Sequence, residues 1–247
     1  MKQIVLIIAI ISSLKLGAQD YKFRENIDKD SLFNNILKDL PERAKEEYKI
    51  MYNEGNEQSK EFLLLIFSMP KSSKKELIEN YDDKRVKILK LKEAYSKLVP
   101  KYYIVDIEFT PAGKIINISE SITINIYKEN GVNDSGKNSV SENWNLQPGS
   151  RELDKVIGTL NWTNQTLIEI KQLLDSANCI SIVNGEITTI GFARSGMGKY
   201  YYMIFDENLT ESQKAEYNNG CEYLFYKDNI VLEYGGGAVG SQCFESE

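Results

Sequence analysis

The spacing of hydrophobic residues along this chain changes near residue 100. Over residues 20–100 they recur every three or four positions, which is typical of amphipathic helices. From Lys101 onward hydrophobic and polar residues alternate, first over residues 103–109, as in a strand with one buried face. We therefore divide the chain into a helical region, residues 19–100, and a strand-rich region, residues 101–247.

Start and stop residues predict three helices in the first region. Pro41 suits the first position of a helix that Gly55 can end. A second helix is expected at about 57–69, where a proline follows. Residues 73–76 form a capping box, Ser-x-x-Glu, at the start of a third helix, which Pro100 closes.

Short strand-like segments in the second region are separated by turn and helix signals. The segment 122–126 alternates again, whereas the Asn-, Gly- and Ser-rich segment 130–141 predicts an exposed loop. Asn184-Gly185 lies between two apolar segments and predicts a hairpin with a type I′ turn. The other predicted strands are 200–205, 221–226 and 230–234, and the other predicted helices are 153–160, one begun by a Thr166–Glu169 capping box, and 210–217.

These elements predict the fold class. Short connections between neighbouring strands favour antiparallel pairing. Regular strand–helix–strand alternation is absent, which argues against a doubly wound parallel sheet. We therefore expect an α+β protein: a helical N-terminal region followed by a mainly antiparallel sheet with one or two packed helices.

The first eighteen residues have the layout of a secretory signal peptide. Lys2 precedes an apolar run, 4–11, and Gly17-Ala18 offers a small-residue cleavage site. The run is shorter than the roughly 20 apolar residues that span a bilayer, and no later segment is longer. An uncleaved N-terminal anchor is the alternative. We expect a periplasmic or secreted protein with no membrane span once the signal peptide, residues 1–18, is removed.

Charge and composition exclude several classes of function. Removing residues 1–18, with two lysines and no acid, changes the formal charge from −6 to −8. Such a surface repels phosphate backbones, so we expect no nucleic-acid partner. The chain has no histidine, which excludes a Ser-His-Asp triad, a His-ligated zinc ion and a histidine general base.

Three cysteines leave the disulfide pairing open. In an oxidising compartment two of Cys179, Cys221 and Cys243 can pair. We favour Cys221 with Cys243, since Cys179 lies between a predicted helix and a predicted strand and can be buried as a small apolar residue. Their spacing matches no zinc pattern, so no metal site is expected.

Two glycine-rich motifs differ in what they predict. Residues 235–240 contain G-x-G-x-x-G, but only seven residues follow, too few for the helix of a dinucleotide site. We expect no cofactor. In Arg194-Ser195-Gly196-Met197-Gly198, the guanidinium, the hydroxyl and the backbone amides can bind an anionic group such as a carboxylate. A simple glycine-rich turn is the alternative.

Tyrosines and acids supply the remaining candidate residues. Tyr200, Tyr201 and Tyr202 place rings on both faces of one predicted strand, which suits either a recognition surface or ordinary packing. Asp106 and Glu108 fall on one face of another strand. Paired carboxylates can hydrolyse glycosides, although two acids on the wet face of a sheet are common.

The C-terminal block resembles a group of secreted bacterial proteins of uncharacterised function. The resemblance is carried by Ala177-Asn178-Cys179, the Arg-Ser-Gly-Met-Gly motif at 194–198 and Glu233-Tyr234-Gly235-Gly236-Gly237, and it covers about residues 155–244. It implies export and carries no activity, cofactor or site residue.

The sequence therefore favours an exported binding or interaction protein without catalysis. Its partner would be a protein or small ligand of the cell envelope, and Arg194, Ser195 and Tyr200–Tyr202 are the candidate contacts. The alternative is a carboxylate-dependent hydrolase that acts on glycan or cell-wall material through Asp106 and Glu108.

Overall fold

The computed structural model describes residues 22–38, 40–129, 137–235, 240 and 242–244, and the predicted signal peptide lies outside these residues. The chain forms two compact units. The first comprises residues 1–68 and 112–119, and the second comprises residues 69–111 and 120–247.

In the part of the first unit that the structure describes there are three helices, α2 (Lys29–Lys38), α3 (Glu42–Glu54) and α4 (Glu57–Phe67). Pro41 precedes α3, and the side chain of Asn56 caps α4 by accepting from the Ser59 amide. The segment 112–119 joins this unit through an antiparallel bridge between Phe23 and Ile116. Its buried core consists of Phe33, Leu37, Tyr52, Leu63 and Leu64.

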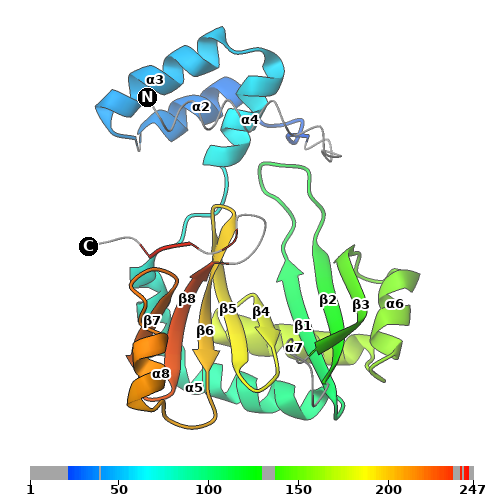
Figure 1. The fold of residues 1–247 in the computed structure, drawn as a ribbon. Helices are drawn as coiled ribbons and strands as arrows, with labels where there is room; N and C mark the ends of the chain where they lie inside the picture. The colour runs from blue at the N-terminus through cyan, green and yellow to red at the C-terminus, as the bar shows by residue number, and fades with distance from the viewer. Residues whose placement is uncertain (1–21, 39, 130–136, 236–239, 241, 245–247) are drawn as a thin grey trace. The chain divides into compact units, whose positions relative to one another are not determined.

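The second unit contains one eight-stranded sheet in the order β3-β2-β1-β4-β5-β6-β8-β7 (Figure 1). Every strand pair that the structure describes is antiparallel, so the predicted α+β fold is confirmed. The strands are β1 (Tyr103–Thr110), β2 (Ser121–Glu129), β3 (Lys137–Leu146), β4 (Ser181–Val183), β5 (Thr188–Ser195), β6 (Gly198–Ile204), β7 (Tyr223–Lys227) and β8 (Ile230–Gly235).

Two long helices, α5 (Lys74–Leu98) and α7 (Asn164–Ala177), cover one face of this sheet (Figure 1). The shorter helix α6 (Arg151–Gly158) adds Leu153, Val156 and Ile157 to the same core. Helix α8 (Glu211–Glu216) lies at the opposite face, where the segment around it packs on Met203 and Val231.

Helix α5 belongs to the sheet unit, whereas the sequence division at residue 100 placed it with the other helices. Leu77, Ile88 and Leu91 are fully buried in the sheet core. The hydroxyl of Tyr95 donates to the Val105 carbonyl of β1 at 2.9 Å. Periodicity shows that a helix has an apolar face, but it does not show which element covers that face.

Three local predictions differ from the structure. Strand β3 occupies residues 137–146, part of which was predicted as a loop; the rest of that loop, residues 130–136, lies outside the described residues. The capping box of α7 is formed by Thr163 and Thr166, one turn earlier than predicted. The β4–β5 connection spans residues 184–187 instead of the predicted two-residue turn, because the Asn184 side chain is hydrogen-bonded to the backbone of β1.

Candidate functional site

A row of directly opposed residues crosses the sheet on the face opposite α5 and α7. Their neighbours in each strand, such as Ile107, Ile182 and Leu232, point into the helix-covered core, so the row points the other way. We call this face the polar face and these residues the polar row. The polar row runs Glu108, Ser181, Gly191, Tyr201, Glu233 and Tyr223, on β1, β4, β5, β6, β8 and β7.

A β-bulge brings Arg194 to the polar face. The register shifts between Gly191 and Ala193, so that one extra residue is inserted in β5. Phe192 and Ala193 both pack toward the helix-covered core. After the bulge the alternation of side chains resumes, so Arg194 lies on the polar face, like Gly191.

Arg194 and Lys199 bind the same carboxylate from two strands. The Nε of Arg194 donates to Oε1 of Glu108 at 2.9 Å, and Nη2 donates to the same oxygen. The Nζ of Lys199 donates to Oε2 of Glu108 at 2.9 Å and to the Ser181 hydroxyl at 3.0 Å. The Lys199 and Glu108 side chains are each 10% exposed, whereas that of Arg194 is 43% exposed and can contact a ligand.

Gly191 leaves the space through which Lys199 reaches Glu108. A Cβ at this position would lie 2.1 Å from the Ser181 hydroxyl and 3.2 Å from Cδ and Cε of Lys199. Glycine is therefore required for a packing reason at the centre of the polar row. The aliphatic stem of Lys199 crosses β5 at this position.

The electrostatics of Glu108 suit binding rather than proton transfer. Burial opposes ionisation of Glu108, but the Lys199 and Arg194 cations hold its pKa below the usual value. Burial likewise opposes the charge of Lys199, and the Glu108 carboxylate holds the pKa of this amine above its usual value. Both oxygens of Glu108 accept hydrogen bonds from cations. The group is therefore a fixed carboxylate.

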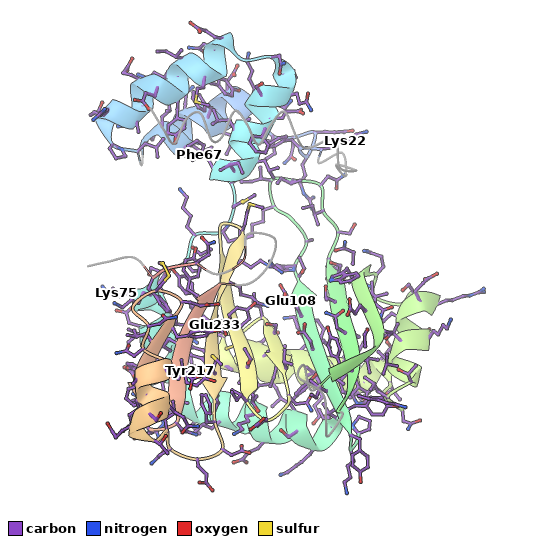
Figure 2. The ribbon with its side chains drawn as sticks, viewed as in Figure 1. Lys22, Phe67, Lys75, Glu108, Tyr217 and Glu233 are labelled. Carbon is purple, nitrogen blue, oxygen red and sulfur yellow. A yellow bond between two sulfur atoms is a disulfide. The ribbon has the colours of Figure 1, made fainter. Side chains whose placement is uncertain are left out.

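Glu233 is a carboxyl group of different character in the same row. Figure 2 shows Glu108 and Glu233 on separate strands of the sheet. Burial, and then the nearby Glu222 carboxylate, raises the pKa of Glu233 to about 7, with Lys199 acting in the opposite direction. Tyr201 and Tyr223 lie directly opposite it on the two neighbouring strands.

The candidate residues predicted from the sequence lie on two different faces of the sheet. Arg194 and Tyr201 lie on the polar face, and Asp106 does too, where its carboxylate accepts from the Asn125 amide at 3.3 Å. Tyr200 and Tyr202 are 2% and 0% exposed and belong to the helix-covered core.

Ser195 anchors the turn between β5 and β6. Its hydroxyl donates to the Ser72 carbonyl at 2.8 Å and accepts from the Ser72 amide at 3.3 Å. The Gly196 amide donates to the Pro70 carbonyl at 2.8 Å, and Gly196 has a φ of +57°. The contacts of Ser195 therefore fix the turn to the segment that precedes α5.

The cysteines form one disulfide and one buried thiol. Cys221 is joined to Cys243, the pairing that the sequence analysis favoured. Cys179 is free and buried, and burial raises the pKa of its thiol. It lines a cavity of about 370 Å³ between α7 and β5, together with Asp175, Asn178 and Phe192. A thiol with a raised pKa is a poor nucleophile.

No family model, curated protein or solved structure matches this chain. The resemblance of the C-terminal block to secreted bacterial proteins therefore stays a prediction. Its glycine-rich end, residues 236–239, lies outside the described residues. Among the described residues no group of three acids or cysteines could hold a metal ion.

Sequence reasoning missed Lys199, Ser181 and Glu233 as members of the site. Lys199 could have been noticed, because lysine is depleted in strands and this one directly follows Gly198 in a tyrosine-rich predicted strand. The bulge in β5 decides which face Arg194 occupies. Gly191 is the one local signal, because an isolated glycine in a strand marks either a bulge or a close approach, but it does not decide between them.

Proposed function

We propose that this protein is an exported, non-catalytic binding protein that holds a protein or small ligand of the cell envelope against its polar face. The half-exposed guanidinium of Arg194 is the central contact, and Tyr201 is the aromatic contact beside it. The observation that carries this proposal is the Glu108–Arg194–Lys199 cluster, in which buried side chains orient an exposed one.

The cluster supports binding because it fixes a side chain that is otherwise flexible. Two bonds from Nε and Nη2 to Glu108 fix the plane of the Arg194 guanidinium. Lys199 holds the opposite oxygen of the same carboxylate. An oriented side chain loses less conformational entropy when a ligand binds, which favours affinity.

Export is supported by the leader-like residues 1–18 and by the disulfide. Disulfides persist in oxidising compartments, such as the periplasm and the cell exterior. None of the described helices is long and apolar enough to cross a membrane. The site of action that we propose is therefore the periplasm or the medium.

The hydrolase alternative receives less support. Glu108 is held ionised by two cations, which does not suit a general acid. This argues against the pair named from the sequence, Asp106 and Glu108 on β1, although their spacing would allow it. The carboxyl group with a raised pKa, Glu233, is too far from Glu108 to form another pair: four strand spacings along the polar row, or about 19 Å at about 4.8 Å each. Glycosidase carboxyl groups are about 5–9.5 Å apart.

Affinity purification from the native cell envelope tests the binding proposal. The bait is the full chain, compared with Arg194→Ala and Tyr201→Ala. Arg85→Ala is the matched control. Arg85 lies on helix α5, its side chain is 50% exposed, and it pairs with Asp228. We expect one partner to be lost with both polar-face variants and retained with the control, at equal thermal stability. Identical capture by all four proteins would refute the proposal.

A further inference from the structure

Glu233 is a partly buried carboxyl group without a counterion. Among the described residues its carboxyl group has no hydrogen bond and no ion pair, although its strand, β8, is paired on both sides. By contrast, Glu108 in the same row is bonded to two cations. Removing a carboxylate from water without a partner costs free energy, so an incoming positive charge is favoured at Glu233.

Two tyrosine rings flank this carboxyl group. Tyr201 of β6 and Tyr223 of β7 lie directly opposite Glu233 in the two strand pairs of β8. Cross-strand neighbours on one face have Cβ atoms about 5 Å apart. A cationic side chain above Glu233 would therefore meet a carboxylate and an aromatic ring at once, and cations are attracted to the faces of such rings.

Lys199 does not fill this position. Its Nζ donates to Glu108 and Ser181, which lie across Gly191 in the opposite direction from β8. The ammonium lies 4.7 Å from the Tyr201 ring centroid but forms no ion pair with Glu233. Arg194 and Lys199 share the Glu108 carboxylate, and Lys199 offsets only part of the effect of burial and of the Glu222 carboxylate on Glu233. A further positive charge is therefore favoured on the Glu233 and Glu222 side of the polar row.

We propose that Glu233, with Tyr201 and Tyr223, is the acceptor for a lysine or arginine side chain of a basic partner protein. The occupant is a protein segment, because a segment along the polar row can place a cation at Glu233 and a hydrogen-bond acceptor, such as a carbonyl or carboxylate, at Arg194. The formal charge of the chain is −6, which attracts a basic partner. This inference rests on the proposed function, since it names the chemistry of the partner on the same face.

Direct binding of a defined peptide tests the inference. The probe is a labelled peptide of alternating arginine and glycine, acetylated and amidated so that it does not titrate between pH 5.5 and 8. The counterpart with glutamate in place of arginine is the control peptide. We expect binding of the basic peptide only, and at least tenfold weaker binding to Glu233→Gln. Glu93→Gln, an exposed position on α5, removes the same charge and should leave binding unchanged.

The pH profile separates a direct role from a loss of folding. The titratable groups that face Glu233 are Lys199 and Tyr201 on β6, Glu222 and Tyr223 at β7, and Tyr217 at the end of α8. Peptide binding to the wild type should weaken as the pH falls from 8 to 5.5, because Glu233 gains a proton. Glu222→Gln should retain that pH dependence, and Glu233→Gln should lose it.

Each outcome either supports or overturns the inference. Equal binding of the basic peptide to the wild type and Glu233→Gln, or no binding to either, overturns it. Displacement of the peptide by millimolar tetramethylammonium would indicate a site for small cations and would overturn the proposal that the ligand is a protein segment. The proposed function fails separately, since it depends on capture of an envelope partner through Arg194 and can stand when the basic peptide does not bind.

Discussion

Replacing Glu233 by glutamine should remove a pH-dependent loss of stability. The pKa of this carboxyl group rises from 4.5 to about 7 in the folded protein, mainly through burial. At about 1.4 kcal/mol for each pKa unit, the rise corresponds to about 3 kcal/mol. Because Glu233 is only partly buried, water screens part of this effect, and we expect about 1–3 kcal/mol.

The sign follows from proton binding. Between pH 4.5 and 7 the folded state holds a proton on Glu233 that the unfolded state has lost, so stability falls as the pH rises through this window. Glutamine is neutral throughout and avoids this loss. The assay is urea unfolding of the wild type, Glu233→Gln and the charge-matched Glu93→Gln at pH 5 and pH 8.

We expect the free energy of unfolding of Glu233→Gln, relative to the wild type, to rise by about 1–3 kcal/mol between pH 5 and pH 8. The Glu93→Gln variant corrects for the removal of one negative charge from an acidic chain. A pH-dependent difference for Glu233→Gln no larger than that for Glu93→Gln would refute the reasoning. It would mean that water reaches the carboxyl group freely.

The remaining predictions concern the packing of the polar row and the disulfide. Gly191→Ala should lower the free energy of unfolding by about 1–3 kcal/mol, measured in urea, because the new methyl group meets the Ser181 hydroxyl. Glu108→Ala should cost about 3–5 kcal/mol by leaving Lys199 buried without its anion, whereas the double change Glu108→Leu with Lys199→Met should recover most of that loss. Cys243→Ser should cost about 3 kcal/mol under oxidising conditions, and added dithiothreitol should then lower the melting temperature of the wild type only.

The order and type of most elements could be predicted from the sequence because they depend on local signals. The Ser73–Glu76 capping box begins α5 as expected, and Pro41 and Gly55 bound α3. Strand β3 was missed because Asn and Ser dominate it, and its pairing is supplied by β2. The position of α5 on the sheet could not be predicted, because any apolar surface of suitable shape can bury the same helix face.

The site could be predicted only in part. Asp106 and Glu108 were placed on one face correctly, since alternation in β1 is unbroken. The partnership of Glu108 with Arg194 joins residues 86 positions apart and depends on the strand order β1-β4-β5, which no local pattern contains. Alternation places Tyr201 on the face opposite Tyr200 and Tyr202, but which of the two faces is buried depends on where α5 and α7 pack.

The buried ion cluster argues for a role beyond stability. Desolvating a carboxylate and an ammonium costs free energy that their attraction only partly returns, so apolar side chains of similar volume could fill the place of Glu108 and Lys199 at equal or better stability. In this protein that substitution would leave Arg194 exposed on the sheet with no carboxylate to orient it. The feature that the cluster secures is therefore the direction of one half-exposed guanidinium. If the double variant Glu108→Leu with Lys199→Met keeps its stability and loses the envelope partner, recognition of that partner explains the free-energy cost of burying the cluster. If it keeps both, Glu108 and Lys199 have no part in binding.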